Sequence, residues 1–221
     1  MIGRSMKIHC VYGQSYDSNI YVVEGKHPTI IDCGTGLYHD TVAKQINSII
    51  DPHTITQIIL THEHYDHVGG IKKLQGLTGK NATIFAHKYA VNKIERGESM
   101  FARMLGGVMP KMPVDVHLDE GDTIAIGDEQ STVLYTPGHT PGSLCLYAKE
   151  SNSLISGDTI FSHGSFGRYD LPGGNGALLK QSIERVGKLE ITNLYPGHEE
   201  CIEGNAKQHI ELTLKNSRYL I

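Results

Sequence analysis

Cysteine is scarce in this sequence, with four residues in 221, and the four stand singly as Cys10, Cys33, Cys145 and Cys201. Because no CxxC pair occurs, neither a disulfide framework nor a structural zinc site of the cysteine type is expected. Cys33 directly follows Asp32, and we expect it to be a small buried residue rather than part of a site.

Long apolar runs are also missing. No stretch approaches the roughly 18 consecutive apolar residues that a membrane-spanning helix needs. The first ten residues, MIGRSMKIHC, lack the apolar core of a signal peptide. We therefore expect a cytoplasmic protein with no membrane partner.

Positive charge is not in excess, since 20 Lys and Arg stand against 24 Asp and Glu for a formal net charge of −4. Proteins that bind nucleic acids usually carry a basic footprint, so no nucleic-acid partner is expected. No internal repeat or low-complexity linker interrupts the chain, and its length suffices for a full hydrophobic core. We expect one domain over residues 1–221, with a homo-oligomer left open.

The most informative segment is THEHYDHVGG at residues 61–70, which carries His62, His64, Asp66 and His67. It follows the short apolar run 57–60, which predicts a buried strand. Loops at the carboxyl ends of strands often carry ligand-binding residues. If the backbone stays extended, His62 and His64 share one side while Asp66 and His67 point elsewhere, giving two adjacent metal positions. The alternative is a solvated polar loop.

Three later loops carry further candidates, each after an apolar run and a glycine. They are His139 in TPGHTPGS, Asp158 in SGDTIF and His198 in PGHEE. A catalytic metal site needs more ligands than one local motif supplies, and these residue types are suitable.

Together with Asp32 in IIDCGTG, these motifs in this order resemble the metallo-β-lactamase superfamily of metallohydrolases over nearly the whole chain. The resemblance implies an α/β fold, a four-layer αββα sandwich of two mixed sheets flanked by helices. It implies that Asp32 contacts a ligand histidine and fixes the tautomer and orientation of its ring. The alternative is that Asp32 is a turn residue with no contact to the site. The catalytic carboxylates would be Asp66 and Asp32. The implied ligands are His62, His64 and His139 for one metal, Asp66, His67 and His198 for the other, and Asp158 between them.

Within the superfamily, the true β-lactamases lack an aspartate at the position of Asp158, which disfavours antibiotic hydrolysis. The flavodiiron branch has a glutamate in place of His64 and adds a flavin domain. The segment GDTIFSHGSFGRYDLPGG instead resembles the glyoxalase II-like hydrolases, a branch that includes thioester hydrolases and persulfide dioxygenases. Tyr169 and Asn175 depart from that pattern. Arg168 and Tyr169 are candidate substrate contacts, although Arg168 could instead pair with Asp170 and brace the loop.

Residues 97–115 are rich in Met and Gly and do not follow a known pattern. The helical spacing of Met100, Phe101, Met104 and Leu105 favours a helix that faces the core. The alternative is a flexible lid that accepts an apolar or acyl substrate. The helical extension with which glyoxalase II binds glutathione is not evident after His198, so a glutathione thioester is not implied.

The predicted function is a dinuclear hydrolase of a thioester, lactone or other ester of a small molecule. Two divalent ions are expected, zinc in the first place, with iron or manganese as alternatives. Water between two such ions becomes a hydroxide nucleophile near neutral pH. A mononuclear iron persulfide dioxygenase using His62, His139 and Asp158 is the main alternative. A phosphodiesterase or nuclease and a non-catalytic metal-binding scaffold are less favoured.

Apolar periodicity also predicts the elements. Strands are expected at 6–11, 19–23, 29–32, 57–60, 83–86, 116–118, 122–126, 131–135, 143–148, 153–155 and 193–195, and helices at 40–50, 71–77, 87–96, 178–189 and 205–219.

Overall fold

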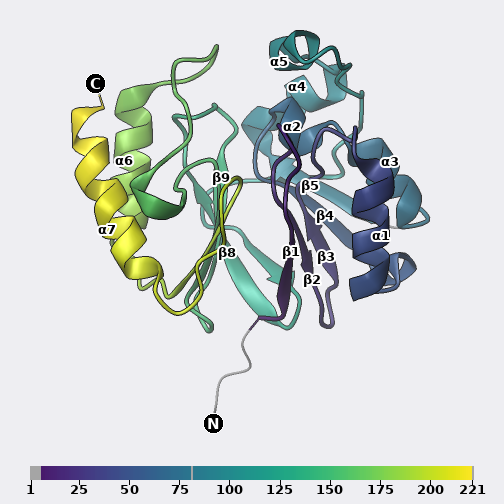
Figure 1. Ribbon diagram of the computed structural model, residues 1–221, viewed down its shortest axis with the longest axis horizontal. Coiled ribbons are helices and arrows are strands. Elements are labelled where there is room, and N and C mark those ends of the chain that lie inside the picture. Colours follow the sequence, from purple (N-terminus) through teal and green to yellow (C-terminus); the bar gives the residue numbers. More distant parts are fainter. Residues whose placement is uncertain (1–5, 81, 221) are drawn as a thin grey trace. The chain divides into compact units, whose positions relative to one another are not determined.

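The computed structural model describes residues 6–80 and 82–220 (Figure 1). The chain forms two compact units, which we call the amino-terminal unit (residues 6–118 and 125–128) and the carboxy-terminal unit (residues 119–124 and 129–220). A single domain over residues 1–221 stays a prediction. No helix within the described residues is long and apolar enough to cross a membrane.

In the described residues, the amino-terminal unit contains a six-stranded mixed sheet with strands in sequence order. The first three strands are antiparallel neighbours, and the last four run parallel. The strands are β1 (Ile8–Val11), β2 (Ile20–Val23), β3 (Thr29–Ile31), β4 (Gln57–Leu60), β5 (Thr83–His87) and β6 (Val116–Leu118).

Helices cover this sheet and build its core. They are α1 (His39–Ile49), α2 (Tyr65–Val68), α3 (Ile71–Leu77), α4 (Lys88–Arg96) and α5 (Met100–Met104), with a 3-10 turn η1 (Pro52–Thr54). In Figure 1, α1 and α3 lie side by side along the sheet. Ile46 of α1 and Ile71 of α3 are fully buried against Ile58 and Ile84 of the central strands. The amphipathic pattern that predicted these helices therefore marks the face that packs on the sheet.

A second mixed sheet has the strand order β11-β10-β9-β8-β7, and all of it except the last two residues of β7 belongs to the carboxy-terminal unit. β8, β9 and β10 are antiparallel neighbours, while β10 and β11 are parallel. The strands are β7 (Thr123–Ile126), β8 (Glu129–Tyr135), β9 (Leu144–Ala148), β10 (Ser153–Gly157) and β11 (Asn193–Pro196).

Two long helices pack on this second sheet, and they lie side by side in Figure 1. Leu179 and Ile183 of α6 and Ile210 of α7 form one apolar cluster with Leu154 and Leu194 of the strands. The helical elements are η2 (Ser162–Gly164), α6 (Gly176–Val186), α7 (Ala206–Asn216) and η3 (Ser217–Tyr219).

Two mixed sheets flanked by helices are thus present, which confirms the predicted fold class. The strand expected from Met6 begins at Ile8, and the helix expected from Leu178 begins at Gly176. The earlier start has a local cause, because the Asn175 side chain accepts a hydrogen bond from the Leu178 amide at 2.9 Å. The short helix α2 was not predicted.

Candidate metal centre

The segment 61–70, which we call the motif loop, leaves the amino-terminal sheet at the carboxyl end of β4, as predicted. His64 is the N-cap of α2, and Asp66 and His67 lie within that short helix. His62, Asp66 and His67 are buried, whereas His64 is half-buried. A solvated polar loop is therefore excluded, since such a loop would leave its side chains in water.

The four side chains of this loop lie close together. The ring centroids of His62 and His67 are 4.0 Å apart, and those of His62 and His64 are 4.8 Å apart. Asp66 Oδ2 lies 3.8 Å from His67 Nε2. The expectation that His67 points away from His62 is wrong. Because α2 curls the chain after His64, the extended backbone does not continue and His67 returns to the ring of His62.

Asp32 supports the motif loop from the end of β3. Its carboxylate accepts hydrogen bonds from the Thr61 amide at 2.8 Å, from the Thr61 hydroxyl at 2.7 Å and from His67 Nδ1 at 2.8 Å. The alternative of a turn residue without contact to the site is therefore wrong. Since Nδ1–H of His67 donates to Asp32, Nε2 is the ring nitrogen left to act as a metal ligand.

The backbone of Asp32 is itself unusual. Its φ is +61°, and the residue is only 1% exposed. Aspartate tolerates this left-handed region better than most residues do, but the conformation persists only where the surroundings fix it. The Asp32 amide donates to the Ile59 carbonyl, so the neighbouring strand β4 holds it in place.

The carboxy-terminal unit brings together the other three predicted ligands, which follow β8, β10 and β11. Asp158 Oδ2 lies 3.3 Å from His139 Nε2 and 3.7 Å from His198 Nε2. His139 and Asp158 are buried, and His198 is half-buried. One carboxylate oxygen therefore faces two imidazole nitrogens from different loops.

The segment after Asp158 orients His139 through its backbone. His139 Nδ1–H donates to the Arg168 carbonyl at 2.6 Å, which leaves Nε2 for the side facing Asp158. Gly167 makes this approach feasible, since a Cβ at that position would lie 2.1 Å from the Asp158 carbonyl oxygen and 2.8 Å from His139 Nδ1. Gly167 thus gives the space, and the Arg168 carbonyl accepts the hydrogen bond that orients His139. The sequence did not reveal this role of the backbone.

The Arg168 side chain points elsewhere. Its Nε and Nη2 donate to the two carboxylate oxygens of Asp170 at 2.9 and 2.7 Å, and both side chains are exposed. This pairing holds the pKa of Asp170 below its usual value. The predicted brace within the loop is present, while substrate contacts of Arg168 and of the exposed Tyr169 stay predictions.

A second support that the sequence did not reveal lies beside His198. The carboxylate of Glu199 accepts hydrogen bonds from the Ser162 hydroxyl at 2.9 Å and from the Ser165 hydroxyl at 2.7 Å. Glu199 has a φ of +68°. We call these three residues the Glu199 clamp. It ties the loop that carries His198 to η2, the turn that follows Asp158.

The Met-rich segment forms the short helix α5, capped by the Ser99 hydroxyl, which accepts from the Ala102 amide at 3.1 Å. Phe101 and Leu105 pack on the core of the amino-terminal unit, whereas Met104 is 71% exposed. A helix with one face on the core is confirmed. The side chain of Met100 lies outside the described residues, and a lid function stays a prediction.

The donors in both units suit divalent metals. Imidazole nitrogens and carboxylate oxygens are ligands for zinc, iron and manganese alike. In the motif loop the ligand atoms of three pairs lie within 4.8 Å of each other, namely His62 with His64, His62 with His67, and Asp66 with His67. Burying carboxylates among imidazoles is costly without a positive charge to compensate them. The residues present therefore fit metal ions as cofactors.

With this geometry established, comparison with known proteins identifies the family. The metallo-beta-lactamase superfamily pattern matches residues 15–198, a range that contains Asp32 and all seven candidate ligands. The chain belongs to the metallo-beta-lactamase superfamily.

Three similar proteins illustrate its range. A hydroxyacylglutathione hydrolase of Maricaulis maris is 32% identical over 155 residues, which cover 70% of this chain and 52% of that protein. The chain thus spans about half the length of that relative. The crystal structure of the BLEG-1 B3 metallo-beta-lactamase matches with a TM-score of 0.79 and 25% identity over 96% of this chain and 99% of that chain. TTHA1623 in a di-iron-bound form matches with a TM-score of 0.74 and 31% identity over 94% and 96%.

Proposed function

We propose that this chain is a metal-dependent hydrolase with a dinuclear centre, and that it cleaves a thioester, lactone or other ester of a small molecule. The observation that carries the proposal is the position of Asp158, whose Oδ2 faces Nε2 of both His139 and His198. A carboxylate so placed suits a bridge between two cations. The proposed ligands are His62, His64 and His139 for one ion, Asp66, His67 and His198 for the other, and Asp158 for both.

The residues of the chain would prepare the centre before substrate arrives. Asp32 fixes the tautomer of His67, and the Arg168 carbonyl fixes that of His139, so that both Nε2 lone pairs are available. Two bound divalent ions would activate water as a nucleophile and stabilise negative charge developing on the substrate. Two carboxylates among seven ligands leave the loaded centre net positive. No serine or cysteine nucleophile is required.

The substrate class is inferred more coarsely. A relative named as a hydroxyacylglutathione hydrolase supports hydrolysis of a thioester, but this chain matches only half of that protein. The B3 metallo-beta-lactamase similarity at 25% identity leaves a lactam as an outcome to be tested. For the metal, the di-iron form of a relative supports iron alongside zinc.

The test is to add Zn²⁺, Mn²⁺ or Fe²⁺ to metal-free protein and follow hydrolysis of S-lactoylglutathione, a simple acyl thioester, a lactone and a β-lactam. We expect activity on an ester or thioester to reach its maximum at two ions per chain. Replacing His67 with Ala should remove one ion and most of the rate. His53→Ala, at an exposed histidine of the same unit, is the matched control and should retain two ions and the full rate.

A different outcome would overturn the proposal. If the protein purified without added metal holds one iron per chain and consumes oxygen with a persulfide, the dioxygenase alternative is correct. In that case His67→Ala should keep most of the rate, because the second-site histidine would not hold the reacting ion.

A further inference from the structure

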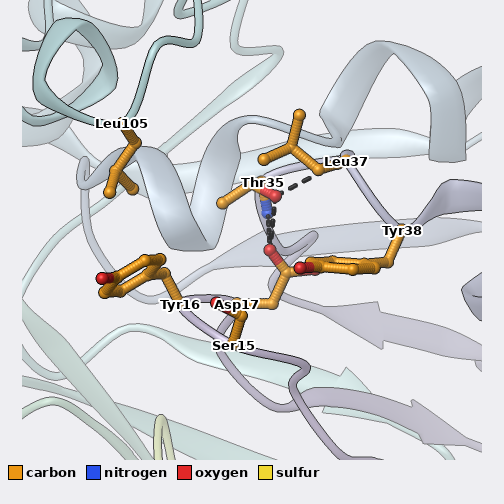
Figure 2. A pocket seen from close by; sticks show the side chains of 7 residues that line it. All are labelled: Ser15, Tyr16, Asp17, Thr35, Leu37, Tyr38 and Leu105. Atoms are coloured by element: carbon orange, nitrogen blue, oxygen red, sulfur yellow. Dashed lines mark hydrogen bonds between the residues drawn. The ribbon is translucent and has the colours of Figure 1, made fainter.

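A cavity of about 220 Å³ lies in the amino-terminal unit, apart from the predicted ligands (Figure 2). It is formed by the loop after β1, the loop after β3 and one residue of the Met-rich segment. The residues that matter for its chemistry are Tyr16, Asp17, Thr35, Leu37, Tyr38 and Leu105.

The walls of the cavity are aromatic and aliphatic. In the view of Figure 2, the rings of Tyr16 and Tyr38 lie on either side of Asp17, with Leu37 and Leu105 above them. Tyr16 and Leu37 are 62% and 63% exposed, so the cavity opens to solvent between them. Leu105 comes from the segment in which we predicted a core-facing helix or a lid.

The polar group in this cavity is Asp17, which is only 5% exposed. Its Oδ1 accepts hydrogen bonds from the Thr35 amide at 2.9 Å and from the Thr35 hydroxyl. Among the described residues, no donor is hydrogen-bonded to Oδ2 and no Lys or Arg forms an ion pair with Asp17. Burial raises the pKa of this carboxyl, and the two hydrogen bonds from Thr35 offset part of that rise. Thr35 therefore fixes one carboxylate oxygen, and the other is available to accept a hydrogen bond from a ligand.

We propose that this cavity binds the ammonium group of a small molecule that carries a primary amine. An ammonium has three donors for the Asp17 carboxylate, and its positive charge is attracted to the faces of tyrosine rings. The leucines would contact the methylene groups next to the nitrogen. An anion is disfavoured because the Asp17 carboxylate in the cavity repels it, and a purely apolar group would leave that carboxylate without a compensating charge.

The cavity is adjacent to the motif loop. The Ser18 amide, one residue after Asp17, donates to the Asp66 carbonyl at 3.1 Å, and the Gly70 amide donates to the Gly34 carbonyl beside Thr35. The amine would therefore be part of a molecule that also reaches the motif loop. This step rests on the proposed function and makes the substrate an ester or thioester that carries an amino group.

The experiment uses n-butylammonium as the probe and n-butanol as its uncharged match, with the full-length protein. NMR shifts of the Thr35 amide report binding directly and do not depend on activity. We expect the amine, but not the alcohol, to shift this signal and to inhibit ester hydrolysis competitively. Asp17→Asn keeps an oxygen for Thr35 but loses the charge. It should lower the affinity for the amine about tenfold or more.

Asp40→Asn, at an exposed aspartate on α1, is the control and should leave amine binding unchanged. Tyr38→Leu keeps an apolar wall but removes the ring. This second variant should lower the affinity for the amine several-fold. The inference is overturned if butanol binds as well as the amine, or if Asp17→Asn binds the amine as the natural protein does. Amine binding in a protein that hydrolyses no ester would instead contradict the proposed function and leave the cavity assignment in place.

Discussion

At the residue scale, the candidate site depends on a few side chains and backbone atoms that hold the predicted metal ligands in one orientation. Asp32 adopts a left-handed backbone conformation and accepts three hydrogen bonds, one of them from His67, a predicted ligand. The Arg168 carbonyl performs the same task for His139. Such outer contacts set ligand geometry and basicity, and their loss usually lowers metal affinity.

Replacement of Asp32 by Asn tests the first of these contacts. Asn tolerates the same backbone conformation, but it loses the charge that faces His67 Nδ1. We expect affinity for one of the two ions to fall about 10- to 100-fold with the fold retained. Isothermal titration with Zn²⁺ measures the affinity, and circular dichroism checks the fold. An unchanged affinity would show that Asp32 does not act on the metal ligand.

Gly167 gives a steric test. The Cβ of Gly167→Ala would lie 2.1 Å from the Asp158 carbonyl oxygen, so the segment must move away from His139. We expect the free energy of unfolding to fall by about 1–3 kcal/mol, and metal affinity to fall with it. Denaturant unfolding gives the first quantity.

The matched control is Gly76→Ala on helix α3, where an added Cβ meets no atom within 4 Å. Because alanine favours the helix more than glycine does, the free energy of unfolding of this variant should rise by up to about 1 kcal/mol. Equal losses of stability in both variants would contradict the steric account of Gly167.

At the scale of elements, strands and helices were largely predictable, because apolar period and length are local properties of the sequence. The runs 57–60 and 71–77 form β4 and α3 with the predicted bounds. The helix α2 was missed because its four residues are too few to show a period. The Glu199 clamp was missed for another reason, since it joins residues 34 and 37 positions apart through side-chain hydrogen bonds.

The clamp predicts how one element positions another. Glu199→Ala removes two hydrogen bonds next to His198. It should lower the affinity for the ion that His198 is proposed to bind, with a smaller decrease in Tm. Glu199→Gln keeps both bonding positions, because serine hydroxyls can also accept. We expect Gln to restore most of the affinity in a metal titration. Equal defects in the two variants would mean that the charge of Glu199, rather than its hydrogen bonds, matters.

At the scale of the whole molecule, the seven ligand candidates could be predicted because residue types that bind metals follow strand ends in a recognisable order. Four of these candidates lie in the amino-terminal unit and three in the carboxy-terminal unit. The cavity around Asp17 could not be predicted, since its walls come from loops near residues 16, 36 and 105 that only the fold brings together.

Metal should also stabilise the folded chain, because the ions bind the native state and not the unfolded one. At free metal about 1,000 times Kd, the gain is about 4 kcal/mol for each bound ion. For a chain of this length, each ion then raises Tm by about 10 °C. Differential scanning calorimetry with and without a chelator measures the shift, and adding Zn²⁺ back should reverse it. A Tm that ignores the chelator would contradict a metal-dependent native state.

The central claim is that this chain holds two metal ions with Asp158 between them. The most direct measurement is a crystal structure of the metal-loaded protein, with the ions located by anomalous scattering at the absorption edge of the added metal. We predict two anomalous peaks, both in contact with Asp158, one near His62, His64 and His139 and the other near Asp66, His67 and His198. A single peak held by His62, His139 and Asp158 would contradict the claim.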